Sequence, residues 1–254
     1  MTDAHPAVTN ASLYLSGVTV SFDGFRALNE LSLFLEMGEL RAVIGPNGAG
    51  KSTMMDVITG KTRPDKGEVL LHGRHDLTKL DEPAIAALGV GRKFQRPTVF
   101  ENHTVFENIE LSLKGDRAAL GALFHKLSGE ERKRIDAVLA EIALTERAYD
   151  LAGLLSHGQK QWLEIGMLLA QDPDVLLIDE PAAGMTDAET MQTADMLKRI
   201  SGGNRTVVVV EHDMEFVKAL DCRVTALHEG SVLAEGDLET VSANEAVIEV
   251  YLGR

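Results

Sequence analysis

Strand-like and helix-like hydrophobic patterns alternate along most of this chain. Two alternating apolar segments near the start are separated by Asp23-Gly24, a pair typical of a hairpin turn, and a third apolar run precedes a helical pattern that begins at Lys51. Such alternation is typical of an α/β sheet, and it predicts that several strands are parallel. The predicted strands are residues 13–22, 25–36, 39–45 and 68–73, and the predicted helix is residues 51–60.

Two later runs each contain four consecutive apolar residues instead of alternating ones. They are VLLIDE at 175–180 and TVVVVEH at 206–212. Strands covered by helices on both faces have this pattern, so both runs are predicted in the centre of the sheet. The sequence then predicts a C-terminal hairpin that turns at Glu229-Gly230, followed by two short helices that end at Arg254.

The middle of the chain, from about residue 97 to 157, has no strand signals. Its apolar residues fall at i, i+3, i+4 and i+7, on one face of an amphipathic helix. They are Ile135, Val138, Leu139 and Ile142. The sequence therefore predicts a helical subdomain, residues 97–157, inserted into a single domain that spans residues 12–254 after a flexible N-terminus, residues 1–11. The apolar residues around Trp162 are too dense for a surface stripe and predict buried packing.

Composition and charge narrow the classes of function. The chain has 254 residues, of which 44% are hydrophobic and 25% charged, as in an ordinary folded protein. The net charge of −14 disfavours nucleic-acid binding through a broad basic face, but local phosphate sites remain open. Cys222 is the only cysteine, which excludes an intrachain disulfide, and it is predicted in the core or in a strand. No signal peptide and no membrane-spanning apolar segment is predicted.

A phosphate-binding loop is predicted between the third strand and the helix that follows it. GPNGAGKST matches the pattern G-x-x-x-x-G-K-[ST] in the strand-to-helix context that this motif requires. Its glycines let backbone N–H groups and the helix N-terminus face phosphates closely, while Lys51 adds positive charge and Ser52 offers a hydroxyl to Mg²⁺. The alternative is a glycine turn with a surface lysine. The predicted nucleotide-binding residues of this loop are Gly45, Pro46, Asn47, Gly48, Ala49, Gly50, Lys51, Ser52 and Thr53.

Two carboxylates follow the buried strand at 175–180, at the edge where α/β sheets bind ligands. Asp179 is predicted to help hold Mg²⁺. Glu180 lies where a carboxylate can orient, or take a proton from, the water that attacks the γ-phosphate. The alternative is a pair of solvated acids at a strand end. The two motifs together remain compatible with kinases, GTPases, helicases and transport ATPases.

Further motifs select one family among these. LSHGQ at 155–159 resembles the LSGGQ signature of ABC ATPases. Gln95 in GRKFQRP and His212 in VVVVEHD stand where that family has its Q-loop and switch histidine, and Phe22 stands where it has an adenine-stacking aromatic. Each of these three residues alone would more often be structural. Because these elements all occur in the order found in that family, the chain resembles the ABC ATPase family.

This resemblance implies a fold and a set of roles. The implied fold is an α/β P-loop NTPase of the ABC type, with a mostly parallel core sheet, an N-terminal antiparallel β subdomain and a helical subdomain. The implied cofactors are ATP and Mg²⁺. The implied catalytic residues are Glu180, His212 and Gln95, and the implied metal ligands are Ser52, Gln95 and Asp179. In such proteins the signature contacts ATP bound to a second subunit, which here concerns Ser156, His157, Gly158 and Gln159.

Two positions depart from the family pattern. His157 replaces the first glycine of the signature, and AGMTD at 183–187 replaces the common SALD of the D-loop, which puts Thr186 where aspartate is usual. A protonated His157 would add positive charge toward phosphate, and the alternative is a tolerated variant with no such role. Both departures concern the expected contact between subunits.

The wider sequence resembles the ATPase subunits of bacterial branched-chain amino acid and amide importers. GPNGAGKST, TVFENHTVFENI, EPAAGM and EVYLG carry this likeness, while SFDGFRALN, GRKFQRPTVFENHTVFEN, LSHGQKQWLEIGMLL and LHEGSVLAEG resemble its urea-uptake (UrtD-type) branch. The likeness implies import of urea or short amides, with branched-chain amino acids as the alternative cargo. It implies as partners a related second ATPase subunit, permease subunits and, indirectly, a solute-binding protein, with no nucleic acid. It also implies a place on the cytoplasmic face of the inner membrane, while a homodimer remains open for the isolated chain.

The stretch after Gln95 is expected to face a coupling helix of the permease. Phe100 and Phe106 would line that groove, although core packing is an equal alternative. Two other functions fit less well. A soluble ABC ATPase of DNA repair or translation would have a heptad arm or a second nucleotide site, and a P-loop kinase would give LSHGQ and His212 no role.

Overall fold

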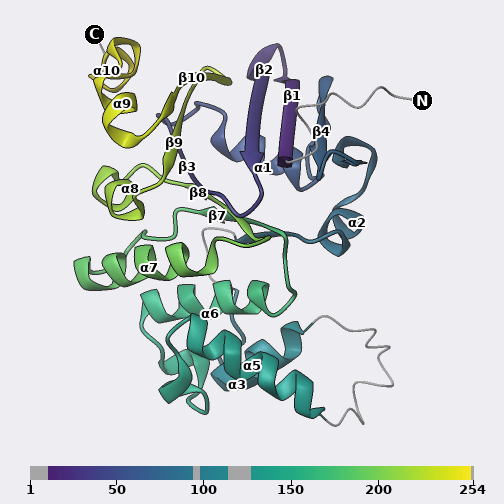
Figure 1. Ribbon diagram of the computed structural model, residues 1–254, viewed down its shortest axis with the longest axis vertical. Coiled ribbons are helices and arrows are strands. Elements are labelled where there is room, and N and C mark those ends of the chain that lie inside the picture. The colour runs from purple at the N-terminus through teal and green to yellow at the C-terminus, as the bar shows by residue number, and fades with distance from the viewer. Residues whose placement is uncertain (1–10, 94–97, 114–126, 253–254) are drawn as a thin grey trace.

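The computed structural model describes residues 11–93, 98–113 and 127–252, and Figure 1 shows their arrangement. The strands are β1 (Ala11–Phe22), β2 (Phe25–Glu36), β3 (Leu40–Ile44), β4 (Lys66–Leu71), β5 (His75–Asp76), β6 (Val90–Lys93), β7 (Val175–Asp179), β8 (Thr206–Val210), β9 (Arg223–His228) and β10 (Ser231–Gly236). The helices are α1 (Lys51–Ile58), α2 (Glu82–Ala87), α3 (Val105–Ser112), α5 (Gly129–Glu141), α6 (His157–Leu169), α7 (Asp187–Ile200), α8 (Met214–Leu220), α9 (Leu238–Ala243) and α10 (Glu245–Leu252). Short 3-10 turns occupy Leu77–Lys79, Thr145–Arg147 and Ala152–Leu154.

The described strands form two sheets. The first is antiparallel, with the order β2-β1-β4-β5, and the second has the order β10-β9-β3-β8-β7-β6. In the second sheet every neighbouring pair from β9 to β6 is parallel, and only the C-terminal hairpin β9-β10 is antiparallel. The predicted α/β architecture is therefore confirmed, including the antiparallel N-terminal sheet and the mostly parallel core sheet.

Several predicted boundaries are confirmed, and the small differences have local causes. Asp23 (φ 48°) and Gly24 (φ 87°) form the predicted turn of the first hairpin, and β9 and β10 pair across Glu229-Gly230 as expected. The helix after the phosphate-binding loop ends at Ile58 rather than at residue 60, because Gly60 has a φ of 80°, outside the helical region.

The continuously apolar strands are buried on both faces, as predicted. Leu176 and Ile178 of β7 point toward a core shared with α3, α5, α6, α7 and α8. Val175 and Leu177 point the other way, into a core shared with α1 and the antiparallel sheet. None of the four has exposed surface. Side chains alternate between the two faces of a strand, so the four positions from Val175 to Ile178 are all apolar and fill both layers.

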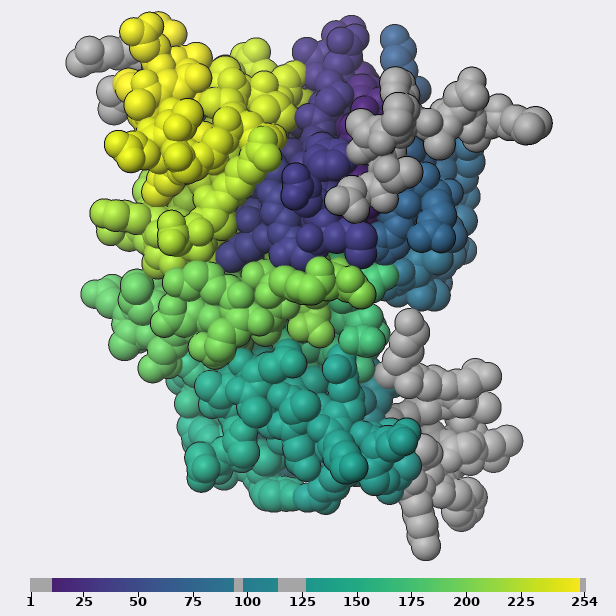
Figure 2. All heavy atoms as spheres, in the orientation of Figure 1, coloured from purple at the N-terminus to yellow at the C-terminus, as the bar shows by residue number. Residues whose placement is uncertain are grey.

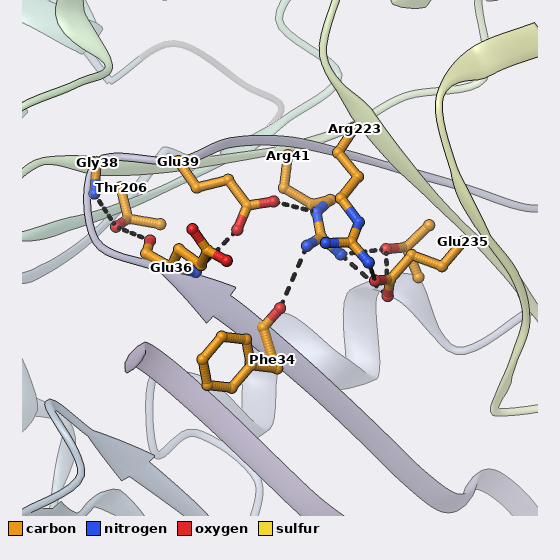
Figure 3. A network of polar contacts seen from close by, with 9 residues as sticks. Phe34, Glu36, Gly38, Glu39, Arg41, Thr206, Arg223 and Glu235 are labelled. Carbon is orange, nitrogen blue, oxygen red and sulfur yellow. Dashed lines mark hydrogen bonds and ion pairs between the residues drawn. The ribbon is translucent and has the colours of Figure 1, made fainter. Parts of the chain in front are cut away.

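A buried arginine joins the two sheets (Figure 3). Arg41 of β3 has no exposed surface, yet it donates to Glu39 Oε1 (2.6 Å), Thr225 Oγ1 (2.8 Å) and the carbonyl oxygen of Phe34 (3.2 Å). Its Nη1 also lies 3.1 Å from Glu235 Oε2. These partners belong to β2, β9, β10 and the start of β3. Because a buried charge must be paired and hydrogen-bonded, this network fixes the core sheet against the N-terminal hairpin.

The helical part lies at the opposite end from the antiparallel sheet, below α7 in Figure 1, and it forms the teal end of the face in Figure 2. The predicted apolar face of α5 is buried there, with Ile135, Val138 and Leu139 at most 1% exposed. Trp162 of α6 is 5% exposed, which confirms buried packing.

Cys222 directly precedes β9 and packs against the core, and burial raises the pKa of its thiol to about 11. Among the described residues, no helix combines the length and the apolar character needed to cross a bilayer.

Candidate nucleotide-binding site

The phosphate-binding loop turns from the end of β3 into α1 with a bare helix start. The residue that precedes α1 is Gly50, with a φ of 102°, and no side chain of the described residues caps the helix. A Cβ at this glycine would lie 2.6 Å from the carbonyl oxygen of Ala27 and the backbone would be strained, so glycine is required by both space and conformation. The first N–H groups of an uncapped helix have no intrahelical acceptor, and they suit an anion.

Lys51 folds back across this loop. Its Nζ donates to the carbonyl oxygens of Gly45 (2.6 Å) and Pro46 (3.1 Å). Burial lowers the pKa of Lys51, and the nearby carboxylates of Glu180 and Asp179 oppose that shift. A lysine held among carbonyls and carboxylates on the loop is positioned to exchange the carbonyls for phosphate oxygens.

Most predicted nucleotide residues line one cavity of about 370 Å³. The aromatic rings of Phe22 and Phe25 stand at this cavity together with the carboxylates of Asp179 and Glu180. Both rings are largely exposed, at 49% for Phe22 and 64% for Phe25, so neither is used in the core. The loop residues that line it are Asn47, Gly48, Ala49, Gly50, Lys51, Ser52 and Thr53. The cavity thus combines an aromatic surface, a phosphate-binding loop and two acids.

The end of β7 delivers both acids, as predicted. Asp179 is its last residue, and Glu180 continues the register by donating its N–H to the carbonyl oxygen of Val210 (2.9 Å). Glu180 has a φ of 45°, a left-handed conformation that costs a non-glycine residue on the order of 1–3 kcal/mol and that is often found at functional sites. His212 Nδ1 lies 3.3 Å from Glu180 Oε1 at the end of β8, and its side chain is 64% exposed. Two of the three predicted catalytic side chains, Glu180 and His212, therefore meet, while Gln95 lies outside the described residues.

Arg92 is a residue of this site that sequence reasoning missed. It lies in β6, 6% exposed, with its guanidinium paired to Asp56 of α1 and 3.9 Å from Asp179 Oδ2. Burial raises the pKa of Asp179, and the charge of Arg92 opposes this. The segment VGRK was not predicted as a strand, because two consecutive basic residues are unusual in a buried strand. In the structure these two charges are paired with Asp56 and Glu164.

A second missed residue is Glu164, a carboxylate on the buried face of α6. Lys93 Nζ lies 3.6 Å from its Oε2, and the Thr98 hydroxyl donates to its Oε1 at 3.0 Å. Burial raises the pKa of Glu164 and lowers that of Lys93, and each charge opposes the shift of the other. Lys93 and Thr98 are the described residues on either side of Gln95, which itself lies outside the described residues. The sequence signal that could have indicated this residue is a single acid within the apolar run WLEIGMLL.

The predicted signature is the start of α6. Ser156 caps the helix by accepting from the N–H of Gln159 (3.2 Å), and Gln159 Oε1 accepts in return from the N–H of Ser156 (3.1 Å) and from Arg147 (2.8 Å). None of Ser156, His157, Gly158 and Gln159 is among the residues that line the nucleotide cavity in the described part of the chain. Within one chain, then, the signature is a separate surface.

The two departures from the family pattern lie beside each other. His157 is exposed, and a Cβ added at Gly184 of the D-loop would lie 3.4 Å from its Cδ2. Thr186 caps α7, accepting from the N–H of Glu189 (3.3 Å), while Glu189 Oε2 accepts from the N–H and the hydroxyl of Thr186. Threonine can therefore replace aspartate here because both residues cap helices well.

Phe106 and Phe100 have different environments. Phe106 is 8% exposed, stacked on Tyr149 with a centroid separation of 5.9 Å, and it receives the Arg132 guanidinium at 5.0 Å. Phe100 is 50% exposed. Core packing therefore accounts for Phe106, while Phe100 remains available at the surface together with Tyr149 and Leu154, which are 68% and 69% exposed.

Comparison with known proteins gives the same assignment. The model of the family described as "ABC transporter" matches residues 28–183, more than half of the chain, and that of "Branched-chain amino acid ATP-binding cassette transporter" matches residues 231–254. The chain is 34% identical over 250 residues to the high-affinity branched-chain amino acid transport ATP-binding protein LivG of Salmonella typhimurium, covering 95% of this chain and 97% of that protein. It is 35% identical over 250 residues to BraF of Pseudomonas aeruginosa, with the same coverage.

Solved structures agree with this result. The ADP conformation of MJ1267, an ATP-binding cassette of an ABC transporter, superposes with a TM-score of 0.81 at 28% identity, covering 96% of this chain and 99% of that one. The dimeric bacterial ABC transporter cassette MJ0796 gives a TM-score of 0.69 at 28% identity, covering 89% and 98%. Together with the motifs and the cavity, these matches show that the chain belongs to the ABC transporter family, as an ATP-hydrolysing, ATP-binding subunit of the LivG and BraF type.

Proposed function

We propose that this chain powers solute import by closing with a second ATPase subunit on ATP and reopening after hydrolysis. The observation that supports this most strongly is the separation of two phosphate-binding features. Lys51, Ser52, Asp179 and Glu180 share one cavity, whereas the signature at the start of α6 is absent from its lining. A signature that cannot reach the nucleotide of its own chain suits a nucleotide held by another chain.

Each residue of the cavity has a role in this proposal. Lys51 binds the β- and γ-phosphates, and Phe22 stacks on the base. Glu180 orients the attacking water and accepts its proton, and His212 holds Glu180 and contacts the γ-phosphate. Gln95 remains a predicted ligand of Mg²⁺ and a contact of the water. The left-handed conformation of Glu180 aims its carboxylate at the cavity that it lines.

The donors at this site fit Mg²⁺. The Ser52 hydroxyl and the Asp179 carboxylate line the same cavity, and oxygen ligands of this kind are those that Mg²⁺ prefers. When bound, Mg²⁺ would be held by Ser52 and Asp179 and would offset the negative charge of the phosphates. The Arg92 guanidinium beside Asp179 favours the ionised carboxylate that such a ligand requires.

The partners follow from the two surfaces. A related ATPase subunit, or a second copy in isolation, would face the nucleotide cavity and the signature. Permease subunits would contact the helical part near Phe100, Tyr149 and Leu154, whose exposure leaves apolar area to cover. The complex would hold this chain at the cytoplasmic face of the inner membrane, with a solute-binding protein acting on the permease from the other side.

For the cargo we favour branched-chain amino acids over urea. Relatives named for high-affinity branched-chain amino acid transport match 95% of the chain, and the C-terminal residues 231–254 match a family of the same description. The case for urea or short amides depends on the resemblance of shorter segments such as SFDGFRALN and LHEGSVLAEG, and neither LivG nor BraF is named for urea. The cargo contacts other chains, so the ATPase residues do not decide this choice.

Solute uptake in cells tests both levels of the proposal. Labelled leucine and labelled urea are supplied at low concentration to cells that carry a chromosomal Lys51→Ala variant, with Lys66→Ala, an exposed lysine of β4, as the control. Selective loss of leucine uptake is the expected result. Selective loss of urea uptake would show that urea, and not a branched-chain amino acid, is the cargo. Normal uptake of both solutes would contradict coupling to either import system.

A further inference from the structure

The signature serine has its only proton engaged within its own chain. Ser156 Oγ donates to Glu189 Oε1 at 2.8 Å, while it accepts the N–H of Gln159 at 3.2 Å. A hydroxyl has one proton to donate. As long as this hydrogen bond stands, Ser156 cannot also donate to a phosphate oxygen.

Glu189 connects the signature to the D-loop. It is the third residue of α7, and its Oε2 accepts from the N–H (3.0 Å) and the hydroxyl (2.9 Å) of Thr186. The same side chain lies over Gly158, where an added Cβ would be 2.8 Å from Oε1. These hydrogen bonds from Thr186 and Ser156 lower the pKa of Glu189, which is therefore a carboxylate at neutral pH. A negative charge thus lies against the glycine and serine that the proposed function directs toward a phosphate.

We propose that Glu189 is a positioning residue that restrains ATP-driven closure, because Ser156 must exchange this carboxylate for the γ-phosphate of the facing subunit. The inference rests on the proposed function, in which the signature meets the nucleotide of another chain. The exchange replaces one charge-assisted hydrogen bond by another and brings two negative groups close together, so it raises the ATP concentration needed for closure. The contact also links closure to the D-loop. When Ser156 is released, the hydrogen bonds from Thr186 are the ones that Glu189 keeps.

The anchoring of the two helices keeps the exchange local. Trp162 Nε1 donates to Thr193 Oγ1 (2.8 Å), and Thr193 Oγ1 donates to the carbonyl oxygen of Glu189 (2.7 Å). α6 and α7 are thereby fixed one to two turns beyond the signature, and the Ser156–Glu189 contact can break by side-chain rotation without separating the helices. The restraint on closure therefore depends on side-chain rotation, while the backbones of the two helices stay fixed.

The test measures the ATP concentration at half-maximal dimer formation in the slow-hydrolysis Glu180→Gln background, by light scattering. Glu189→Gln removes the charge and one acceptor oxygen, yet glutamine still supports a capping box, so α7 retains its start. Asp195→Asn removes a charge from an exposed position of the same helix, paired with Lys198 and not with Ser156, and it serves as the matched control. Thermal unfolding of each variant shows that the fold is intact.

We expect Glu189→Gln to lower the half-maximal ATP concentration about fivefold. The variant loses the hydrogen bond from Ser156 to the carboxylate, and this bond stabilises the open state alone. Asp195→Asn should leave this concentration nearly unchanged. In a Ser156→Ala background, where no hydroxyl is held, Glu189→Gln should have no further effect beyond that of Asp195→Asn. An unchanged or higher ATP requirement, or the same shift with and without Ser156, would overturn the inference. Absence of any ATP-dependent dimer in Glu180→Gln alone would overturn ATP-driven closure between two copies of this chain, and with it the inference.

Discussion

Two helices of this protein begin at motifs for which we propose phosphate contacts, and their first turns differ. α1 starts after Gly50 with no side-chain cap, so its N-terminus is open to the cavity of its own chain. α6 starts after Ser156, which caps it in a reciprocal capping box with Gln159 and is itself bonded to Glu189. The first helix leaves its N–H groups to a ligand, whereas the second has the N–H groups of Ser156 and Gln159 satisfied within the chain.

This difference indicates how one fold can divide the binding of a nucleotide between two subunits. An open N-terminus binds phosphate as soon as nucleotide arrives. A capped N-terminus is stable without ligand and makes its contact by exchanging hydrogen bonds. In the proposed cycle, the α1 end would therefore determine nucleotide affinity, and the α6 end would determine the ATP concentration at which two subunits close.

The largest expected effect separates chemistry from binding at the α1 end. Glu180→Gln should reduce ATP hydrolysis by about 10²–10⁴-fold, because the group proposed to accept a proton is lost, while ATP still binds. Steady-state phosphate release and calorimetry with ATP measure the two quantities. Glu239→Gln, an exposed acid of α9, is the control. Near-normal turnover would remove Glu180 from the catalytic role.

The next effect concerns affinity at the same end. Lys51→Ala should weaken ATP binding by about 10–100-fold, the range expected for hydrogen bonds to a charged group. Calorimetry of the isolated chain measures it, with Lys66→Ala alongside. Equal affinity in Lys51→Ala and Lys66→Ala would mean that the open helix end binds phosphate without its lysine.

A third variant tests whether α6 depends on α7 for its stability. Thr193→Val removes the acceptor of the buried Trp162 Nε1–H, and the free energy of unfolding should fall by ~1–3 kcal/mol because that donor is left unsatisfied. Guanidinium denaturation followed by fluorescence of Trp162, the only tryptophan, measures it. Thr190→Val on the same helix is the control, and ADP affinity should not change. A stability equal to that of Thr190→Val would contradict the role assigned to this bond.

The smallest effect identifies the adenine contact. Phe22→Ala should weaken ADP binding by about 0.5–1.5 kcal/mol through lost stacking. Phe25→Ala is the natural comparison, since both rings line the cavity and both are exposed. Titration of each variant with ADP decides between them, and a loss only in Phe25→Ala would transfer the stacking role to that residue.

Sequence reasoning was most successful where a site is built from contiguous residues. The loop from Gly45 to Thr53 and the acids Asp179 and Glu180 were predicted because each motif carries its strand or helix with it. The structure brings Asn47 to Thr53 and both acids to one cavity. The contacts of Arg92 and Glu164 were not predicted. Both are charges inside apolar surroundings, and their partners lie 36 residues or more away in the chain, at Asp56 and Thr98.

The sequence by itself determined the alternation of strands and helices, the buried central strands and the open start of α1, because each depends on hydrophobic period or on glycine within a short segment. Only the tertiary structure decided what the signature serine contacts. Ser156 and Glu189 are 33 residues apart, and a 2.8 Å hydrogen bond between them requires the packing of α6 against α7. Local patterns encode the conformation of each segment, but which side chains meet across two segments depends on how the buried faces fit together.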